Sequence, residues 1–128
     1  MLRIGRHHSV RLTIATGAVL ALGACGGGSG AGAARVDAEV AITDVSFTPA
    51  VVSISAGRAV RWTSTSATER HNILPVVDGS FAKHDTLIKS GEKVTITFDK
   101  VGDYAYYCSI HGSPTAGQRG TVKVSGIN

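Results

Sequence analysis

Short segments in which apolar and polar residues alternate run through most of this 128-residue chain. Residues 36–42 read VDAEVAI and residues 94–98 read VTITF, so that every second residue is apolar or small. A period of two places alternate side chains on one face of a β-strand, and each segment therefore predicts a half-buried strand. Gly, Pro and Asp residues separate these segments, and no helical period is sustained after residue 24. The pattern from about residue 37 to residue 128 predicts an all-β domain, either a sandwich or a small barrel.

One stretch of this domain does not show the alternation. Residues 75–91 carry no clear period, and they predict a long connection with room for one short strand. His84 lies in this connection, where we expect a solvated loop residue.

The first 24 residues have the composition of an export signal. Arg3, Arg6 and Arg11, with no acidic residue among them, precede a run of small and apolar residues that ends at Ala24. A basic start, a short apolar run and a small-residue cleavage site together predict a secretory signal peptide over residues 1–24. The run is shorter than the roughly 20 apolar residues of a membrane-spanning helix, which disfavours the alternative of an uncleaved anchor helix.

The signal ends in Leu22-Gly23-Ala24-Cys25, which resembles the bacterial lipobox. That resemblance implies that Cys25 becomes lipid-modified and is the first residue of an exported protein. Acyl chains on Cys25 would then hold the protein at the outer face of the cell membrane or in the periplasm, and two or more chains anchor stably. Residues 25–36 are rich in Gly and predict a flexible tether, which leaves residues 37–128 as the folded domain.

The net charge of the chain comes mostly from the signal. The whole chain carries +4, but three of its 13 basic residues lie in the signal, which leaves ten against nine acidic residues, a net charge of +1. No basic run remains that would follow a phosphate backbone. We therefore expect no nucleic-acid partner.

The chain has two cysteines, Cys25 and Cys108. If Cys25 is acylated, Cys108 has no disulfide partner in an oxidising compartment. Two interpretations of Cys108 are open on this count alone: a thiolate that binds a metal, or an inert thiol packed as a small apolar residue.

The residues around Cys108 favour the metal. Cys108-Ser109-Ile110-His111 follows the strand pattern that starts at Tyr104, so a thiol and an imidazole lie three residues apart at a strand end. Thiolate and imidazole ligands suit copper, iron and zinc, and two His with one Cys form the trigonal set of blue-copper sites. His71 is the best candidate for the second imidazole, because it follows a polar loop and begins a predicted strand.

These features resemble the cupredoxins, in particular the small plastocyanin- and amicyanin-like members, over most of residues 38–126. The segments that carry the resemblance are Phe47-Thr48-Pro49, Gly57, Val60-Arg61-Trp62, His71-Asn72, Phe98, Gly102-Asp103-Tyr104, residues 106–112 (YYCSIHG) and residues 120–124 (GTVKV). The resemblance implies a Greek-key β-sandwich or barrel of about seven or eight strands, with one mononuclear type 1 copper ion.

The resemblance also assigns roles to individual residues. His71 and His111 are the implied imidazole ligands, and Cys108 is the implied thiolate. The backbone N–H of Asn72 is expected to donate to the Cys108 sulfur, and the Asn72 side chain to bond to Ser109. Such bonds orient ligands and tune the metal.

The chain departs from the family at the weak axial ligand, which is usually a methionine before the last strand. Gln118 stands at that place, and the only methionine of the chain is Met1. Gln is a known axial substitute. Its amide oxygen is a harder donor than a thioether and favours Cu(II), so we expect a lower reduction potential than in relatives with Met. The loop from His111 to Gln118 is longer than in plastocyanin, which leaves the binding of Gln118 open.

Three tyrosines precede Cys108. Tyr104 and Tyr106 share a strand face with Cys108, so we expect both in the core, whereas Tyr107 points outward. Tyr107 is either an electron exit or an ordinary exposed tyrosine.

The function implied is that of a membrane-tethered one-electron carrier, a monomer that docks a redox partner protein near His111. The alternative is a lipoprotein that carries or scavenges copper without an electron-transfer role. We do not expect an enzyme, because a multicopper site needs more histidines than His71, His84 and His111 provide.

Overall fold

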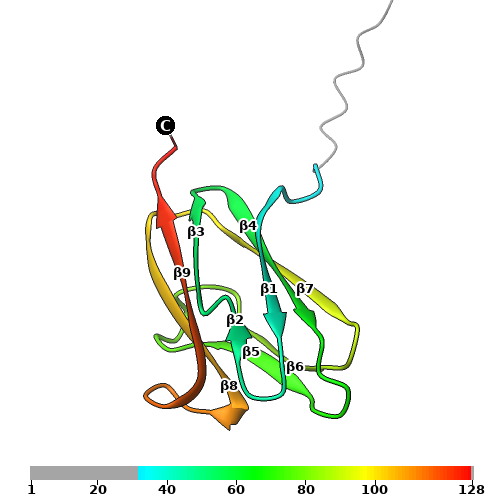
Figure 1. Cartoon of the computed structure of the whole chain (residues 1–128). Coiled ribbons are helices and arrows are strands. Elements are labelled where there is room, and N and C mark those ends of the chain that lie inside the picture. The colour runs from blue at the N-terminus through cyan, green and yellow to red at the C-terminus, as the bar shows by residue number, and fades with distance from the viewer. Residues whose placement is uncertain (1–31, 128) are drawn as a thin grey trace, which may run out of the picture. The chain divides into compact units, whose positions relative to one another are not determined.

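Residues 32–127 are described by a computed structural model, and within them the chain forms nine β-strands and no helix (Figure 1). The strands are β1 (Val36–Ile42), β2 (Phe47–Thr48), β3 (Val51–Ser55), β4 (Arg58–Ser64), β5 (His71–Pro75), β6 (His84–Ile88), β7 (Lys93–Phe98), β8 (Gly102–Gly112) and β9 (Gly117–Ser125).

The strands form two sheets that face each other, one with the order β2-β1-β4-β7 and the other with the order β3-β9-β8-β5-β6. Burial alternates along β3 and β9, as expected where one face of a strand packs on a core and the other meets water. Both sheets are mixed, because β1 runs parallel to β4 and β3 runs parallel to β9. The predicted all-β sandwich is confirmed, with nine strands in the described residues rather than seven or eight.

The core lies between the two sheets and is built around aromatic rings. Trp62 of β4 and Tyr106 of β8 are fully buried, with ring centroids 5.3 Å apart in an edge-to-face arrangement. The ring of Phe47 of β2 also packs edge-on against Tyr106, with centroids 4.8 Å apart. Aromatic rings bury large apolar areas and favour such edge contacts, so this cluster joins the two sheets.

Two details of the strand prediction need correction. The stretch 75–91 contains one short strand, as expected, but His84 begins this strand and is half-buried, so its assignment to a solvated loop is wrong. The strand from Tyr104 does not end at Cys108, because β8 continues to Gly112. Its register against β9 shifts between Tyr107 and Gly112, and such irregularities re-aim side chains locally.

The loop after β1 and the turn between β8 and β9 lie at one end of the sandwich, and the C-terminus lies at the other (Figure 1). Strand β1 begins at Val36, the last residue of the predicted tether. The predicted signal peptide, Cys25 and most of the tether lie outside the described residues. Within the described residues, no helix is long and apolar enough to cross a membrane.

Candidate metal centre

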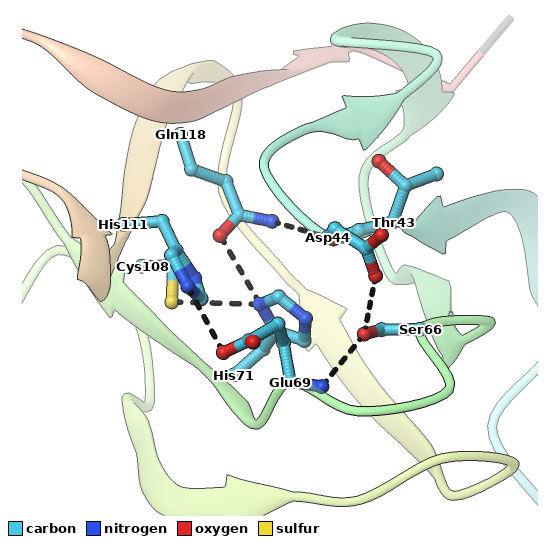
Figure 2. Close-up of polar contacts among 8 residues, drawn as sticks. All are labelled: Thr43, Asp44, Ser66, Glu69, His71, Cys108, His111 and Gln118. Atoms are coloured by element: carbon cyan, nitrogen blue, oxygen red, sulfur yellow. Dashed lines mark hydrogen bonds and ion pairs between the residues drawn. The ribbon is translucent and has the colours of Figure 1, made fainter.

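Three donor side chains from two strands meet at the end of the sandwich that holds the β8–β9 turn. His71 begins β5, and Cys108 and His111 lie in the irregular last part of β8. One ligand atom from each lies within 4.8 Å of the others. The structure thus brings together the three residues that the sequence singled out as ligands (Figure 2).

His71 and Cys108 form the buried side of the cluster. Both side chains are fully buried, and His71 Nδ1 lies 3.8 Å from Cys108 Sγ. Burial lowers the pKa of His71, because the charged imidazolium loses hydration there. The ring is therefore held neutral, which is the form that binds a metal.

His111 forms the side of the cluster nearer to solvent, with 20% of its side chain exposed. Its Nε2 lies 3.3 Å from Oε2 of Glu69. Its Nδ1 is buried and has no hydrogen-bond partner within residues 32–127. Buried polar atoms are nearly always satisfied in proteins, so an unpartnered imidazole nitrogen beside a buried thiol fits a site that takes a metal ion.

Gln118, the residue at the expected axial position, is almost fully buried and points its side-chain oxygen at the cluster (Figure 2). Its Oε1 lies 3.1 Å from His71 Nδ1. Its Nε2 donates to the backbone carbonyl oxygens of Thr43, at 3.3 Å, and Ser46, at 3.1 Å. Because carbonyl oxygens only accept, these two bonds require the amide nitrogen on the side of the 43–46 loop. The oxygen is therefore turned toward His71.

Two glycines allow the chain to bring Gln118 next to His111. Gly112 ends β8 and pairs with Gly117 at the start of β9. A Cβ atom on Gly112 would lie only 2.6 Å from the backbone nitrogen of Gln118, and one on Gly117 would collide with the carbonyl oxygen of His111. Gly117 also has a φ of +79°, a conformation that favours glycine. The close approach of these two strand ends thus depends on the absence of side chains.

Asn72 bridges the two ligand-bearing strands. Its Nδ2 donates to Ser109 Oγ at 2.9 Å, and its Oδ1 accepts from the backbone N–H of Ser109 at 2.9 Å. These bonds join the residue after His71 to the residue after Cys108, as the expected side-chain link requires. The hydrogen bonds of the described residues do not include the expected one from the Asn72 backbone N–H to Cys108 Sγ.

The three tyrosines differ in burial. Tyr106 is fully buried, and burial raises its pKa to about 12. Tyr104 is half-buried and packs against the core, and its hydroxyl donates to the carbonyl oxygen of Lys100 at 2.7 Å. Tyr107, which was expected to point outward, is half-buried and lines an open cavity of about 270 Å³ between β5 and the β5–β6 connection.

Some residues of the site could not be found from the sequence. Glu69 contacts His111, and Thr43 and Ser46 contact Gln118, because the loops after β4 and β1 lie at the same end of the sandwich as these two side chains. No spacing or motif marks them. Glu69, two residues before His71, carried the weakest hint, as an acid next to a candidate ligand.

The comparison with known families decides what this arrangement is. Residues 34–125 match the family described as copper binding proteins of the plastocyanin/azurin family. The chain belongs to this family. The match runs from just before β1 to the end of β9, so the predicted resemblance to cupredoxins is confirmed for the whole sandwich.

Individual cupredoxins agree with this assignment. The chloroplastic plastocyanin of Tetradesmus obliquus is 37% identical over 86 residues, which cover 61% of this chain and 57% of that protein. The chain thus spans less than two thirds of that relative. The plastocyanin of Scenedesmus fuscus is 35% identical over 86 residues, which cover 61% of this chain and 85% of that protein.

A solved structure supports the same conclusion. The purple cupredoxin from Nitrosopumilus maritimus is 29% identical and superposes with a TM-score of 0.56, over 70% of this chain and all of that chain. The cofactor of this copper-binding family fits the donor set present here, because one thiolate and two imidazoles are the ligands of a type 1 copper site.

Proposed function

We propose that this cupredoxin is a one-electron carrier whose type 1 copper ion is held by His71, Cys108 and His111, with Gln118 as the weak axial ligand. The observation that carries the proposal is the orientation of Gln118, whose amide nitrogen is bound by Thr43 and Ser46 so that its oxygen faces the three donors. Copper, when bound, supplies a Cu(II)/Cu(I) couple.

The donors are held by contacts that need no metal. The Asn72–Ser109 hydrogen bonds fix the backbone next to His71 and Cys108, and Gly112 and Gly117 fix the approach of the strands that carry His111 and Gln118. A donor set that is held in place before metal binding changes little between the two oxidation states. A small rearrangement favours rapid electron transfer over release of the ion.

We expect the electron to enter and leave near His111, the ligand nearest to solvent. Ile110 beside it is 48% exposed, and Val45 in the loop after β1 is 67% exposed. Exposed apolar residues close to the site suit short-lived docking of a redox partner protein, at the small end of interface sizes. We expect a monomer with no nucleic-acid partner.

In the copper-carrying alternative, the protein would deliver the copper ion itself rather than an electron. A carrier must give up its ion, whereas the fully buried His71 and Cys108 favour its retention. We propose no enzymatic role, because a multicopper site needs more histidines than His71, His84 and His111 provide.

We also propose export and membrane attachment through a lipid on Cys25. The support is the sequence: the arginines before an apolar run, and the lipobox-like residues that end at Cys25. Expression in a bacterium, followed by fractionation, tests this point. The native protein should pellet with membranes, whereas Cys25→Ser should leave them; equal distribution of the two would contradict the anchor.

The experiment that tests the carrier function compares electron exchange with copper release. The copper-loaded protein should exchange electrons rapidly between its oxidised and reduced forms, as NMR line broadening in mixtures would report. It should also retain Cu(I) against a moderate excess of a Cu(I) chelator. Slow exchange together with rapid loss of Cu(I) to the chelator would favour copper carriage instead.

A further inference from the structure

We infer that Glu69 is a positioning residue for His111: its carboxylate accepts a hydrogen bond from Nε2–H of the ring and thereby turns Nδ1 toward the metal site. The inference rests on the proposed copper site. It goes beyond that site because it assigns a role to a carboxylate outside the ligand set.

The first step concerns the proton on the His111 ring. Oε2 of Glu69 lies 3.3 Å from Nε2 of His111. An ionised carboxylate only accepts hydrogen bonds, so the proton of the neutral ring belongs on Nε2. The other nitrogen, Nδ1, then carries the lone pair, and this buried atom has no hydrogen-bond partner within residues 32–127. The tautomer that Glu69 favours is therefore the one that leaves Nδ1 free to bind a metal.

The second step concerns how Glu69 is held. The Oγ atom of Ser66, a residue only 2% exposed, accepts from the backbone N–H of Glu69 at 2.9 Å. The same hydroxyl donates to Oδ1 of Asp44 at 2.6 Å (Figure 2). Asp44 lies in the loop after β1, and Ser66 and Glu69 lie in the connection between β4 and β5. Two hydrogen bonds thus tie the backbone of Glu69 to the neighbouring loop.

The loop after β1 therefore supports the site in two ways. Its backbone carbonyl oxygens at Thr43 and Ser46 hold Gln118, and the Asp44 side chain, through Ser66, holds the backbone of Glu69. Gln118 and Glu69 act on opposite sides of the cluster, one at the expected axial donor and one behind His111 (Figure 2).

The third step is the consequence for the site. A ligating histidine that donates its other N–H to a carboxylate is fixed in orientation and becomes a more basic ligand. A more basic imidazole and a nearby negative charge both favour Cu(II) over Cu(I). Glu69 is 46% exposed, so solvent weakens the charge effect, and the orientation of the ring is the larger part of the role. We expect Glu69 to lower the reduction potential.

The test begins with the metal-free protein, so that it does not depend on copper binding. The full-length chain is prepared with Cys25→Ser in every sample, which leaves Cys108 as the only thiol. Long-range ¹H–¹⁵N NMR spectra at about pH 8.5, well above the ordinary His pKa of about 6.5, report the tautomer of each neutral ring. Wild-type His111 should be predominantly protonated on Nε2. Glu69→Gln, whose amide oxygen can still accept, should retain this tautomer, and Glu69→Ala should shift the population toward Nδ1–H.

The second readout is the reduction potential of the copper-loaded protein. Glu69→Gln and Glu69→Ala should both raise it, with the larger rise for Ala. The control is Asp103→Asn, which removes the same charge from β8 five residues before Cys108, about 17 Å away along an extended strand. It should change the potential less than Glu69→Ala does.

Two results would overturn the inference: a wild-type His111 that carries its proton on Nδ1, or a Glu69→Ala potential no different from that of Asp103→Asn. Failure of every variant and of wild type to bind copper would instead contradict the proposed function. The tautomer in the metal-free protein would still decide whether Glu69 orients the ring.

Discussion

Gln118 Oε1 lies 3.1 Å from His71 Nδ1, so an amide oxygen faces the three donors where the family usually has a methionine. The arrangement is specific to Gln, because the amide nitrogen at the other end of the group binds two backbone carbonyl oxygens. A methionine has no donor for those carbonyls. Gln118, which departs from the family pattern, is thus held by hydrogen bonds that a methionine could not make.

The first prediction follows from this contact. Gln118→Met replaces a hard oxygen donor by a soft sulfur, which favours Cu(I), so the reduction potential should rise. A tenfold change in relative affinity for the two oxidation states corresponds to about 59 mV for one electron, and we expect a rise of at least that size. Cyclic voltammetry measures it, with Arg119→Met, at an exposed neighbouring position, as the control. An unchanged potential would show that Gln118 does not bind the copper ion.

A second prediction concerns the link between the ligand strands. Asn72→Ala removes two hydrogen bonds to Ser109 in a part-buried place, and we expect it to lower the free energy of unfolding by about 1–3 kcal/mol. Ser109→Ala removes only the side-chain bond and should cost less. Urea unfolding of both single variants and the double variant measures the coupling. Additive effects of the two substitutions would contradict the link.

A third prediction concerns the packing of Tyr106. A Cβ atom on Gly120 of β9 would collide with the Tyr106 hydroxyl and ring and lie 2.9 Å from its Cε1. Because Tyr106 is enclosed by Phe47 and Trp62, its ring has little room to move. Gly120→Ala should therefore destabilise the protein by about 1–3 kcal/mol, measured by thermal or urea unfolding.

Gly126→Ala is the matched control for that substitution, because a Cβ there meets nothing within 4 Å. It should change the free energy of unfolding by less than about 0.5 kcal/mol. Equal stability of the Gly120→Ala and Gly126→Ala proteins would show that the core around Tyr106 is looser than described.

A fourth prediction concerns pH and the metal-free protein. Burial lowers the pKa of His71 in the folded state, so below the ordinary value of about 6.5 the unfolded chain binds a proton that the folded protein does not. The free energy of unfolding should therefore fall as pH decreases below about 6.5, by at most about 1.4 kcal/mol per pH unit for this one group. The decline from His71 ends once the pH is below its folded-state pKa.

Urea unfolding at several pH values between about 7.5 and 5 measures this slope, over the range in which an ordinary His titrates. His71→Gln should reduce the slope, and His84→Gln, at a half-buried position in β6, serves as the histidine control. The same slope in wild type and His71→Gln would mean that another group causes the loss of stability.

The sequence was sufficient for the parts of this protein that depend on local patterns. Alternation predicted the sandwich, and the spacing of Cys108 and His111 after an aromatic strand predicted two ligands that the structure brings together. Gln118 was expected to take the axial position because it stands where the family usually has a methionine and no methionine follows Met1.

Other parts depend on segments that are distant in the sequence. Glu69 contacts His111 across 42 positions, and Thr43 contacts Gln118 across 75. The two-residue strand β2 is too short to show a period, and the continuation of β8 past Cys108 depends on its pairing with β9. Such features depend on how the two sheets pack, and the residues near each feature in the sequence do not predict that packing.

The visible absorption spectrum after addition of one equivalent of Cu(II) tests the type 1 copper site most directly. The sample is the full-length chain with Cys25→Ser, compared with the same chain carrying Cys108→Ser as well. We predict an intense blue or green band from charge transfer between the Cys108 thiolate and copper, and its loss in Cys108→Ser. A spectrum with weak bands alone, the same in both proteins, would contradict the site.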